Sequence, residues 1–310
     1  MSDPRLALNF CGLNFTNPLV LLSGCVGFGE EYTRVQGFSN RDCGAICLKG
    51  TTGAARVGNR PHRLYETPQG MLNAIGLQNP GVDYVIQHIL PTLDFSETRF
   101  IANVSGSTLE EYHEVTRKFD DSPIDAIEIN ISCPNVREGG VAFGNDPDMS
   151  ARVVAACRRA TRKPLITKLS PNQTDIAGNA RRCLEAGSDA FAVINTLMGM
   201  TIDIETRRPH IGNNQGGLSG PAIKPVALLK CHQVYQVTRA HQIPIIGLGG
   251  IFTAADALEF LLAGASAIGI GTALFYDPLV LPEINQGILD YCDQHHIDHI
   301  SQLVGQVQLY

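Results

Sequence analysis

One cysteine stands where a side chain could do chemistry. Cys133 belongs to the segment Asn-Ile-Ser-Cys-Pro-Asn at 130–135, directly after the run Ala-Ile-Glu-Ile at 126–129. A structural cysteine is expected inside an apolar run, where it packs as a small hydrophobic side chain. At the end of a buried strand, beside Pro134 and the amides of Asn130 and Asn135, a thiol can meet a ligand. We take Cys133 as the candidate working thiol; the alternative is one of nine cysteines on an irregular loop.

A lysine lies in an apolar run further along the chain. Lys168 is flanked by Leu165, Ile166 and Leu169, and a buried ammonium group needs a negative partner. A reduced flavin supplies one, because its N1–C2=O edge becomes anionic on reduction and a fixed cation stabilises that charge. The alternatives are a Schiff-base lysine, as in aldolases, and a lysine paired with a core carboxylate.

Asparagines indicate the kind of substrate. Each amide offers one acceptor and two donors, which complement the alternating C=O and N–H groups of a cyclic imide or ureide. A pyrimidine ring fits that requirement, although sugars also recruit asparagine. The candidates are Asn73, Asn130, Asn135 and Asn195.

Two glycine turns suggest a phosphate site. Gly249-Gly250 and Gly271-Thr272 each follow an apolar run and lead toward a helix start. Backbone N–H groups without side chains, next to a helix N-terminus, can hold an anion. Neither turn is a GxGxxG motif, so the dinucleotide fingerprint is absent.

The elements that must position these residues are eight short apolar runs separated by amphipathic or alanine-rich segments of helical length. Alternation of this kind predicts a parallel sheet covered by helices, and eight repeats favour a (β/α)₈ TIM barrel over an open doubly wound sheet. We expect one domain over 1–310, an N-terminal hairpin at 8–15 that closes the barrel floor, and long loops after strands two and six, at 50–81 and 196–220. The predicted strands are 19–22, 45–48, 100–104, 126–131, 165–169, 190–194, 244–248 and 267–270.

Composition narrows the class of protein. The chain has 310 residues, 44% hydrophobic and 17% charged, with a formal net charge of −6. No cluster of Lys and Arg suits a phosphate backbone, so nucleic acid is not expected as a partner. Neither a membrane span nor a signal peptide is visible, which predicts a cytoplasmic protein. The nine cysteines contain no CxxC pair, so we expect reduced thiols, no disulfide framework and no metal site.

The sequence closely resembles the class 1 dihydroorotate dehydrogenases, particularly type B. The resemblance spans nearly the whole chain, and its motifs are long and in the same order. They are the stretches 66–81, 130–135, 142–144, 168–172, 194–200 and 216–225, followed by the two glycine turns.

The resemblance implies an FMN-containing barrel that oxidises dihydroorotate to orotate in pyrimidine (UMP) biosynthesis. Cys133 would be the base that takes a proton from C5 while hydride leaves C6 for the flavin, and Lys49 would help hold the substrate carboxylate. The flavin contacts would be Ser23, Lys49, Gly50, Asn103, Asn130, Lys168, Ile194, Gly220, Gly249, Gly250, Gly271 and Thr272. The substrate contacts would be Lys49, Asn73, Ala74, Ile75, Gly76, Leu77, Asn130, Asn135, Asn195 and Thr196.

Likeness to type B also implies partners. Type B enzymes pass electrons to NAD through a second subunit that carries FAD and a [2Fe–2S] cluster, so we expect a hetero-oligomer built on a homodimer. The alternatives are a self-sufficient, fumarate-dependent type A enzyme and a dihydropyrimidine dehydrogenase subunit; outside this chemistry, a flavin-free aldolase or a non-catalytic phosphate-binding barrel. Class 2 membrane enzymes use a serine base and an N-terminal extension, and neither feature is expected here.

Two positions depart from the family pattern. Cys25 stands where threonine is expected, which adds a second thiol near the flavin. The stretch Lys-Gly-Thr-Thr-Gly at 49–53 is richer in glycine than is usual in the family. The departure includes Gly50, one of the flavin contacts that the resemblance implies.

Overall fold

Eight parallel strands form a closed barrel in the computed structural model, which describes residues 3–131 and 144–310. Their order around the barrel is β10-β15-β16-β3-β4-β7-β8-β9. The predicted (β/α)₈ barrel is confirmed, and each predicted strand differs from the observed one by at most one residue at either end. The strands are β3 (Leu19–Leu21), β4 (Ala45–Cys47), β7 (Arg99–Val104), β8 (Ala126–Asn130), β9 (Leu165–Leu169), β10 (Ala190–Val193), β15 (Ile245–Leu248) and β16 (Ala267–Ile270).

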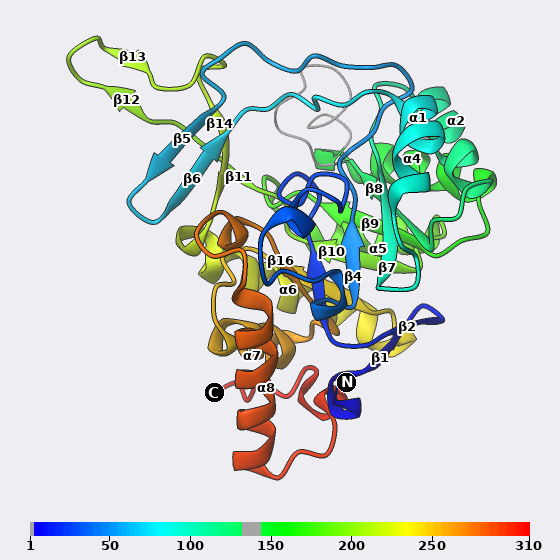
Figure 1. The fold of residues 1–310 in the computed structure, drawn as a ribbon, viewed down its shortest axis with the longest axis vertical. Coiled ribbons are helices and arrows are strands. Elements are labelled where there is room, and N and C mark those ends of the chain that lie inside the picture. Colours follow the sequence, from blue (N-terminus) through cyan, green and yellow to red (C-terminus); the bar gives the residue numbers. More distant parts are fainter. Residues whose placement is uncertain (1–2, 132–143) are drawn as a thin grey trace.

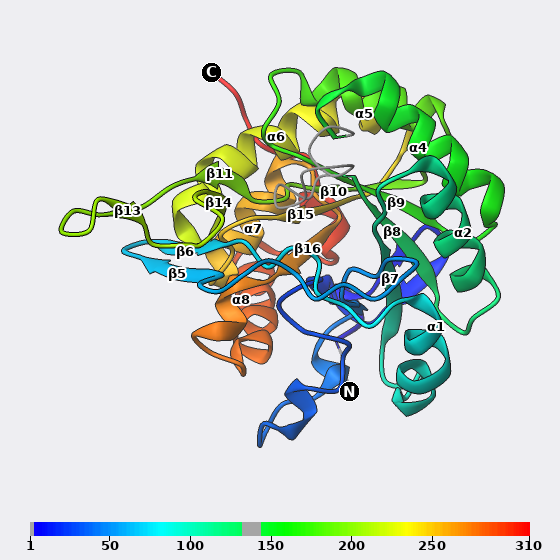
Figure 2. The same ribbon diagram turned by 90° about the horizontal axis from the view of Figure 1, so that it is seen from above.

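Helices surround the barrel, as the view from above shows (Figure 2). Their starts follow from local sequence: the Thr108 hydroxyl accepts from Glu111 N, and Thr253 with Asp256 forms a capping box. A short helical segment, α1 (Val82–Tyr84), precedes strand β7. The other helices are α2 (Leu109–Asp120), α4 (Pro147–Ala160), α5 (Ile176–Glu185), α6 (Lys224–Thr238), α7 (Ala254–Ala263) and α8 (Val280–His295). In the described parts of the chain, every helix is too short or too polar to cross a membrane.

An antiparallel hairpin closes the N-terminal end of the barrel. Strands β1 (Leu8–Phe10) and β2 (Leu13–Phe15) lie below the barrel strands (Figure 1). The rings of Phe10 and Phe15 stack with their centroids 5.3 Å apart. Both side chains are fully buried against the first interior residues of the barrel, so the floor is a packed apolar plug, as the sequence predicts.

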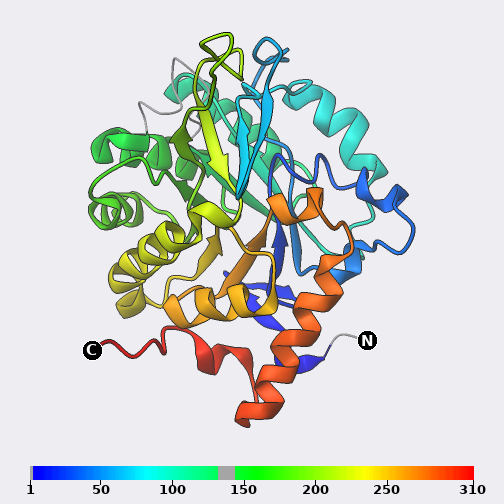
Figure 3. The same cartoon turned by 90° about the vertical axis from the view of Figure 1, so that its left-hand side faces the viewer.

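A second sheet rises at the opposite end of the barrel. It is antiparallel in the order β11-β14-β6-β5, with β11 (Leu197–Gly199), β14 (Gly216–Ser219), β6 (Gly70–Asn73) and β5 (Leu64–Thr67). The two long loops predicted after strands two and six therefore pair with each other. A small hairpin of β12 (Ile202–Asp203) and β13 (Arg208–Pro209) extends beyond this sheet (Figures 1 and 3).

The barrel interior changes in polarity along its axis. Alternate side chains of a strand point to the same side, so residues two apart line successive interior layers. Near the floor the layers are apolar and buried, with Val20, Ala45, Ile101, Ala126, Ile166, Ala190, Ile246 and Ala267. One layer higher, Asn103, Glu128 and Lys168 enter the interior at 0%, 1% and 5% exposure. The strands thus end in a polar rim over an apolar core.

Candidate active site

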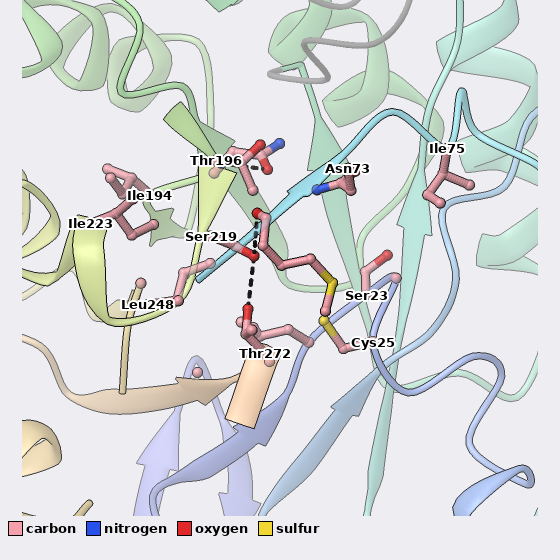
Figure 4. A pocket seen from close by; sticks show the side chains of 18 of the residues that line it. Ser23, Cys25, Asn73, Ile75, Ile194, Thr196, Ser219, Ile223, Leu248 and Thr272 are labelled. Atoms are coloured by element: carbon pink, nitrogen blue, oxygen red, sulfur yellow. Dashed lines mark hydrogen bonds between the residues drawn. The ribbon is translucent and has the colours of Figure 1, made fainter. Parts of the chain in front are cut away.

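A cavity opens at the C-terminal end of the barrel and holds about 1270 Å³ of empty space, including its mouth. Barrel strand ends form its floor, and the second sheet forms one wall with Leu64, Met71, Asn73 and Ser219. Figure 4 shows Asn73 and Thr196 across from Ser23, Cys25 and Thr272. In barrels of this kind the active site lies at this end.

Nearly all the predicted contacts that the structure describes line this cavity. Asn103 and Ala74 are the exceptions: both are buried behind the lining residues. Cys133 and Asn135 lie outside the described residues. The predicted residues at the cavity are Ser23, Lys49, Gly50, Asn73, Ile75, Gly76, Leu77, Asn130, Lys168, Ile194, Asn195, Thr196, Gly220, Gly249, Gly250, Gly271 and Thr272.

Lys168 is paired from below. Its Nζ lies 3.7 Å from Glu128 Oε1, and both side chains are almost fully buried. The same Oε1 accepts from Asn103 Nδ2 at 2.5 Å. The pairing with a core carboxylate, one of the alternatives from the sequence, is therefore present, and Lys168 still lines the cavity.

The second lysine, Lys49, lies two residues beyond the end of β4. The position that a Cβ on Gly24 would occupy is 3.9 Å from Lys49 Nζ, so the ammonium group lies over the loop after β3. Cys25, on the same loop, also lines the cavity. Burial raises the pKa of the Cys25 thiol to about 11, and the charges of Lys168 and Lys49 offset only part of that effect. The thiol is therefore neutral at physiological pH.

Glycines shape one end of the cavity. Gly249 and Gly250 have φ of +130° and +78°, values that side-chain-bearing residues rarely adopt. A Cβ on Gly250 would lie 2.7 Å from Gly220 O and 3.1 Å from Lys224 N at the start of α6. This end is a backbone-lined cradle next to a helix N-terminus, a suitable site for a phosphate group. Close by, the Thr272 hydroxyl donates to Ser219 Oγ at 2.9 Å.

Amide groups hold the opposite wall in place. Asn73 Nδ2 donates to Gly217 O at 3.2 Å, which ties β6 to β14. Asn195 Oδ1 accepts from Thr196 N at 2.8 Å. Asn172 supports the following turn, since its Nδ2 donates to Thr196 O at 3.0 Å and its Oδ1 accepts from Met198 N at 2.9 Å. A polar ring in the cavity would meet groups whose orientation is already fixed.

Some lining residues were not predicted from the sequence. Leu22 and Leu248 follow the interior residues Val20 and Ile246 by two positions, so strand alternation is a signal that could have found them. Residues on the excursions carry no comparable signal. The full unpredicted set is Leu22, Gly24, Leu64, Met71, Ser219, Ile223, Leu248, Ile251, Phe252, Gly269 and Phe275.

The thiols and acidic groups do not gather into a metal site within residues 3–131 and 144–310. No three His, Cys, Asp or Glu side chains there lie close enough together to hold a metal ion. The cysteines in these ranges are free thiols, and six of them are buried.

Comparison with known proteins identifies the family. The family model for dihydroorotate dehydrogenase matches residues 5–291. The chain is 49% identical to the catalytic subunit of dihydroorotate dehydrogenase B (NAD(+)) from Pelobacter propionicus, over 98% of this chain and 99% of that protein. It is 48% identical to the protein of the same name from Geotalea daltonii, over 100% of both chains. The counterpart from Geobacillus kaustophilus is 49% identical, over 97% of this chain and 95% of that one. The chain belongs to the dihydroorotate dehydrogenase family.

Proposed function

We propose that this chain is the catalytic subunit of an NAD-linked dihydroorotate dehydrogenase, which oxidises (S)-dihydroorotate to orotate in pyrimidine biosynthesis. One observation carries the proposal. A single cavity brings together two lysines, an amide-lined wall and a glycine cradle, in a chain that matches this family over nearly its whole length. A polar ring, an anionic substituent and a phosphate each find complementary groups there.

The family implies a flavin cofactor, and we propose FMN as its form. The backbone-lined cradle at Gly220, Gly249 and Gly250 supports this proposal, because it suits one phosphate group, and the chain has no dinucleotide fingerprint. When bound, the flavin would supply the acceptor for the hydride that leaves the substrate. The other residues proposed to hold it are Ser23, Lys49, Gly50, Asn130, Lys168, Ile194, Gly271 and Thr272, with Asn103 acting from behind the floor.

The substrate is proposed to lie against the amide-lined wall. Lys49 holds its carboxylate by charge, and Asn73, Asn130 and Asn195 complement the C=O and N–H groups of its ring. Thr196 and the segment 74–77 complete the contact surface, with Asn135 a further contact. Complementary donors and acceptors orient the ring before reaction and exclude water from it.

Cys133 is proposed as the base that removes the C5 proton of the substrate. It lies outside the described residues, but it follows Asn130 by three positions, and Asn130 lines the cavity. A thiolate is the form that accepts a proton, so proton removal should become faster as pH rises through the titration of this thiol.

The name "catalytic subunit" carried by the relatives implies a partner subunit. We propose that the partner carries FAD and a [2Fe–2S] cluster and passes electrons to NAD, and that two copies of this chain form the core of the assembly. Exposed apolar side chains support an association of copies. Ile202 in β12 and Ile204 in the turn that joins β12 to β13 are 55% and 81% exposed.

The test is a visible spectrum of the purified chain followed by anaerobic titration with dihydroorotate. About one equivalent of FMN should be bound, with an absorption band near ~450 nm that dihydroorotate bleaches. Orotate should compete with dihydroorotate; competition by an uncharged dihydropyrimidine instead would favour a dihydropyrimidine dehydrogenase subunit. A folded protein that cannot be reconstituted with FMN contradicts the proposal.

A further inference from the structure

A buried carboxylate lies beneath the cavity floor without lining the cavity. Glu128 comes from the middle of β8, and its side chain is 2% exposed. It occupies the interior layer one step below Asn130, because residues two apart on a strand point to the same side. The carboxylate is thus screened from solvent by the residues that form the floor.

Glu128 contacts the side chains of both neighbouring strands. On one side, Asn103 Nδ2 donates to Glu128 Oε1 at 2.5 Å; on the other, Lys168 Nζ lies 3.7 Å from the same oxygen. Strand register places Asn103 directly opposite Glu128, whereas Lys168 is opposite Asn130 and reaches Glu128 diagonally. One oxygen atom therefore restrains two side chains assigned to flavin binding.

The cluster is a compact electrostatic unit. Cys47 lies beside it, 4.0 Å from Asn103 Nδ2, but burial raises the pKa of that thiol well above its ordinary range, so it carries no charge. The charges in the unit are those of Glu128 and Lys168. Interactions between buried charges are only weakly screened, so the carboxylate offsets the positive potential that Lys168 exerts at the cavity.

We propose that Glu128 is a positioning residue, which holds Lys168 at the cavity and, by offsetting its charge, sets the reduction potential of the bound cofactor. This inference rests on the proposed function. Two-electron reduction would place negative charge on the flavin, so a cation at the cavity favours the reduced form and a nearby carboxylate disfavours it. Glu128 therefore keeps the flavin more reducing than Lys168 alone would make it, which favours onward transfer of electrons.

The decisive variant is Glu128→Gln. Glutamine keeps an oxygen that accepts from Asn103 and removes the negative charge. The preference for reduced over oxidised FMN should increase by roughly tenfold, which raises a two-electron midpoint potential by about 30 mV. The measurement is a dye-equilibration titration of the full chain loaded with FMN, with FMN affinity measured in parallel by fluorescence.

Two comparisons make the result specific. Asp125→Asn also removes one negative charge, but Asp125 immediately precedes the N-terminal end of β8 and pairs there with Arg99. This variant should leave the reduction potential unchanged. In a Lys168→Met background, Glu128→Gln should change the potential much less, because no cation remains for the carboxylate to hold in place or to offset. Should Glu128→Gln fail to fold, Glu128→Asp keeps the charge but moves it away from Lys168, and should raise the potential by a smaller amount.

An unchanged or lowered potential in Glu128→Gln would overturn the inference, as would the same rise with and without Lys168. Any of these results, obtained with a wild-type chain that binds FMN and is reduced by dihydroorotate, leaves the proposed function intact. Failure of the wild-type chain to bind flavin would instead overturn the proposed function.

Discussion

Removing the Cys133 thiol should separate chemistry from binding. Cys133→Ala should retain FMN, but dihydroorotate should reduce the flavin roughly 10² to 10⁴ times more slowly, the usual contribution of a positioned general base. Stopped-flow absorbance under anaerobic conditions measures this step. Cys11→Ala is the matched control, since Cys11 lies in the turn of the β1–β2 hairpin at the other end of the barrel. Reduction of Cys133→Ala at the wild-type rate would require another base.

Alkylation of Cys25 should report its burial in the cavity. Only the thiolate reacts, and burial raises the pKa of this thiol to about 11. Its fraction of thiolate should therefore increase roughly tenfold per pH unit through the alkaline range below that pKa. Peptide mass spectrometry after brief treatment of the FMN-free chain with iodoacetamide at pH 8, 9 and 10 measures the rate. An alkylation rate that stops increasing near pH 8.5, about the ordinary pKa of a cysteine thiol, would contradict the burial seen here.

Loss of either amide from the cavity wall should weaken binding of the product. Asn73→Ala and Asn195→Ala should each weaken orotate affinity by about 1 to 3 kcal/mol, because a polar group of the ligand loses its partner. Flavin difference spectra give the dissociation constants, and the spectra without orotate should remain close to wild type. Asn73 also ties β6 to β14, so thermal unfolding must accompany that variant. Unchanged affinity in both variants would rule out the pyrimidine-edge assignment.

At the scale of elements, a change in the second sheet should weaken substrate binding more than it destabilises the barrel. A Cβ on Gly70 would lie 2.0 Å from Ser219 O, so Gly70→Ala forces β6 away from the end of β14. Overpacking of this kind costs about 1 to 3 kcal/mol, and orotate affinity should fall while the barrel remains folded. Orotate titration and circular dichroism measure the two effects.

Gly53→Ala provides the control for that variant. It lies in the same excursion, but its Cβ would make ordinary contacts with Glu111 at 3.6 Å. It should therefore bind orotate like the wild type. Equal losses in both variants would mean that the excursion tolerates no added methyl group, and that the β6–β14 contact is not special.

How far the sequence predicts these elements depends on the range of the interactions that form them. Strands buried on both faces are continuous apolar runs, so eight of them were visible, with ends correct to about one residue. The pairing of β6 with β14 cannot be predicted in this way, because no local sequence pattern links two strands whose contacting residues are 144 positions apart in the chain. Glu128 is not predicted as a functional residue, because it lies inside the mostly apolar run Ala-Ile-Glu-Ile-Asn at 126–130. Its alternation with Ala126 and Asn130 was the available signal that it faces inward.

At the scale of the whole molecule, the electron acceptor distinguishes a hetero-oligomer with an electron-transfer subunit from a self-sufficient enzyme. The chain contains neither a GxGxxG turn nor a CxxC pair, so the isolated chain should reduce artificial dyes with dihydroorotate but reduce NAD negligibly. Steady-state assays with dihydroorotate and each acceptor test this. Rapid turnover with fumarate would favour the self-sufficient type A enzyme, and rapid turnover with NAD would show that no partner is needed.

The pairing of β6 with β14 also affects when the active site can form during protein synthesis. The Asn73–Gly217 bond spans 144 residues, and synthesis proceeds at about 5–20 residues per second. The first half of the substrate wall therefore waits roughly 7 to 30 s for its partner to be translated. Closing so long a loop also carries an entropic cost that a formed barrel reduces by holding the two segments near each other. Barrel strands β15 and β16 are synthesised after β14, so neither the closed barrel nor the complete active site can form until late in translation. A nascent chain should therefore acquire its cofactor only after translation has passed β14 and the glycine turns that follow it.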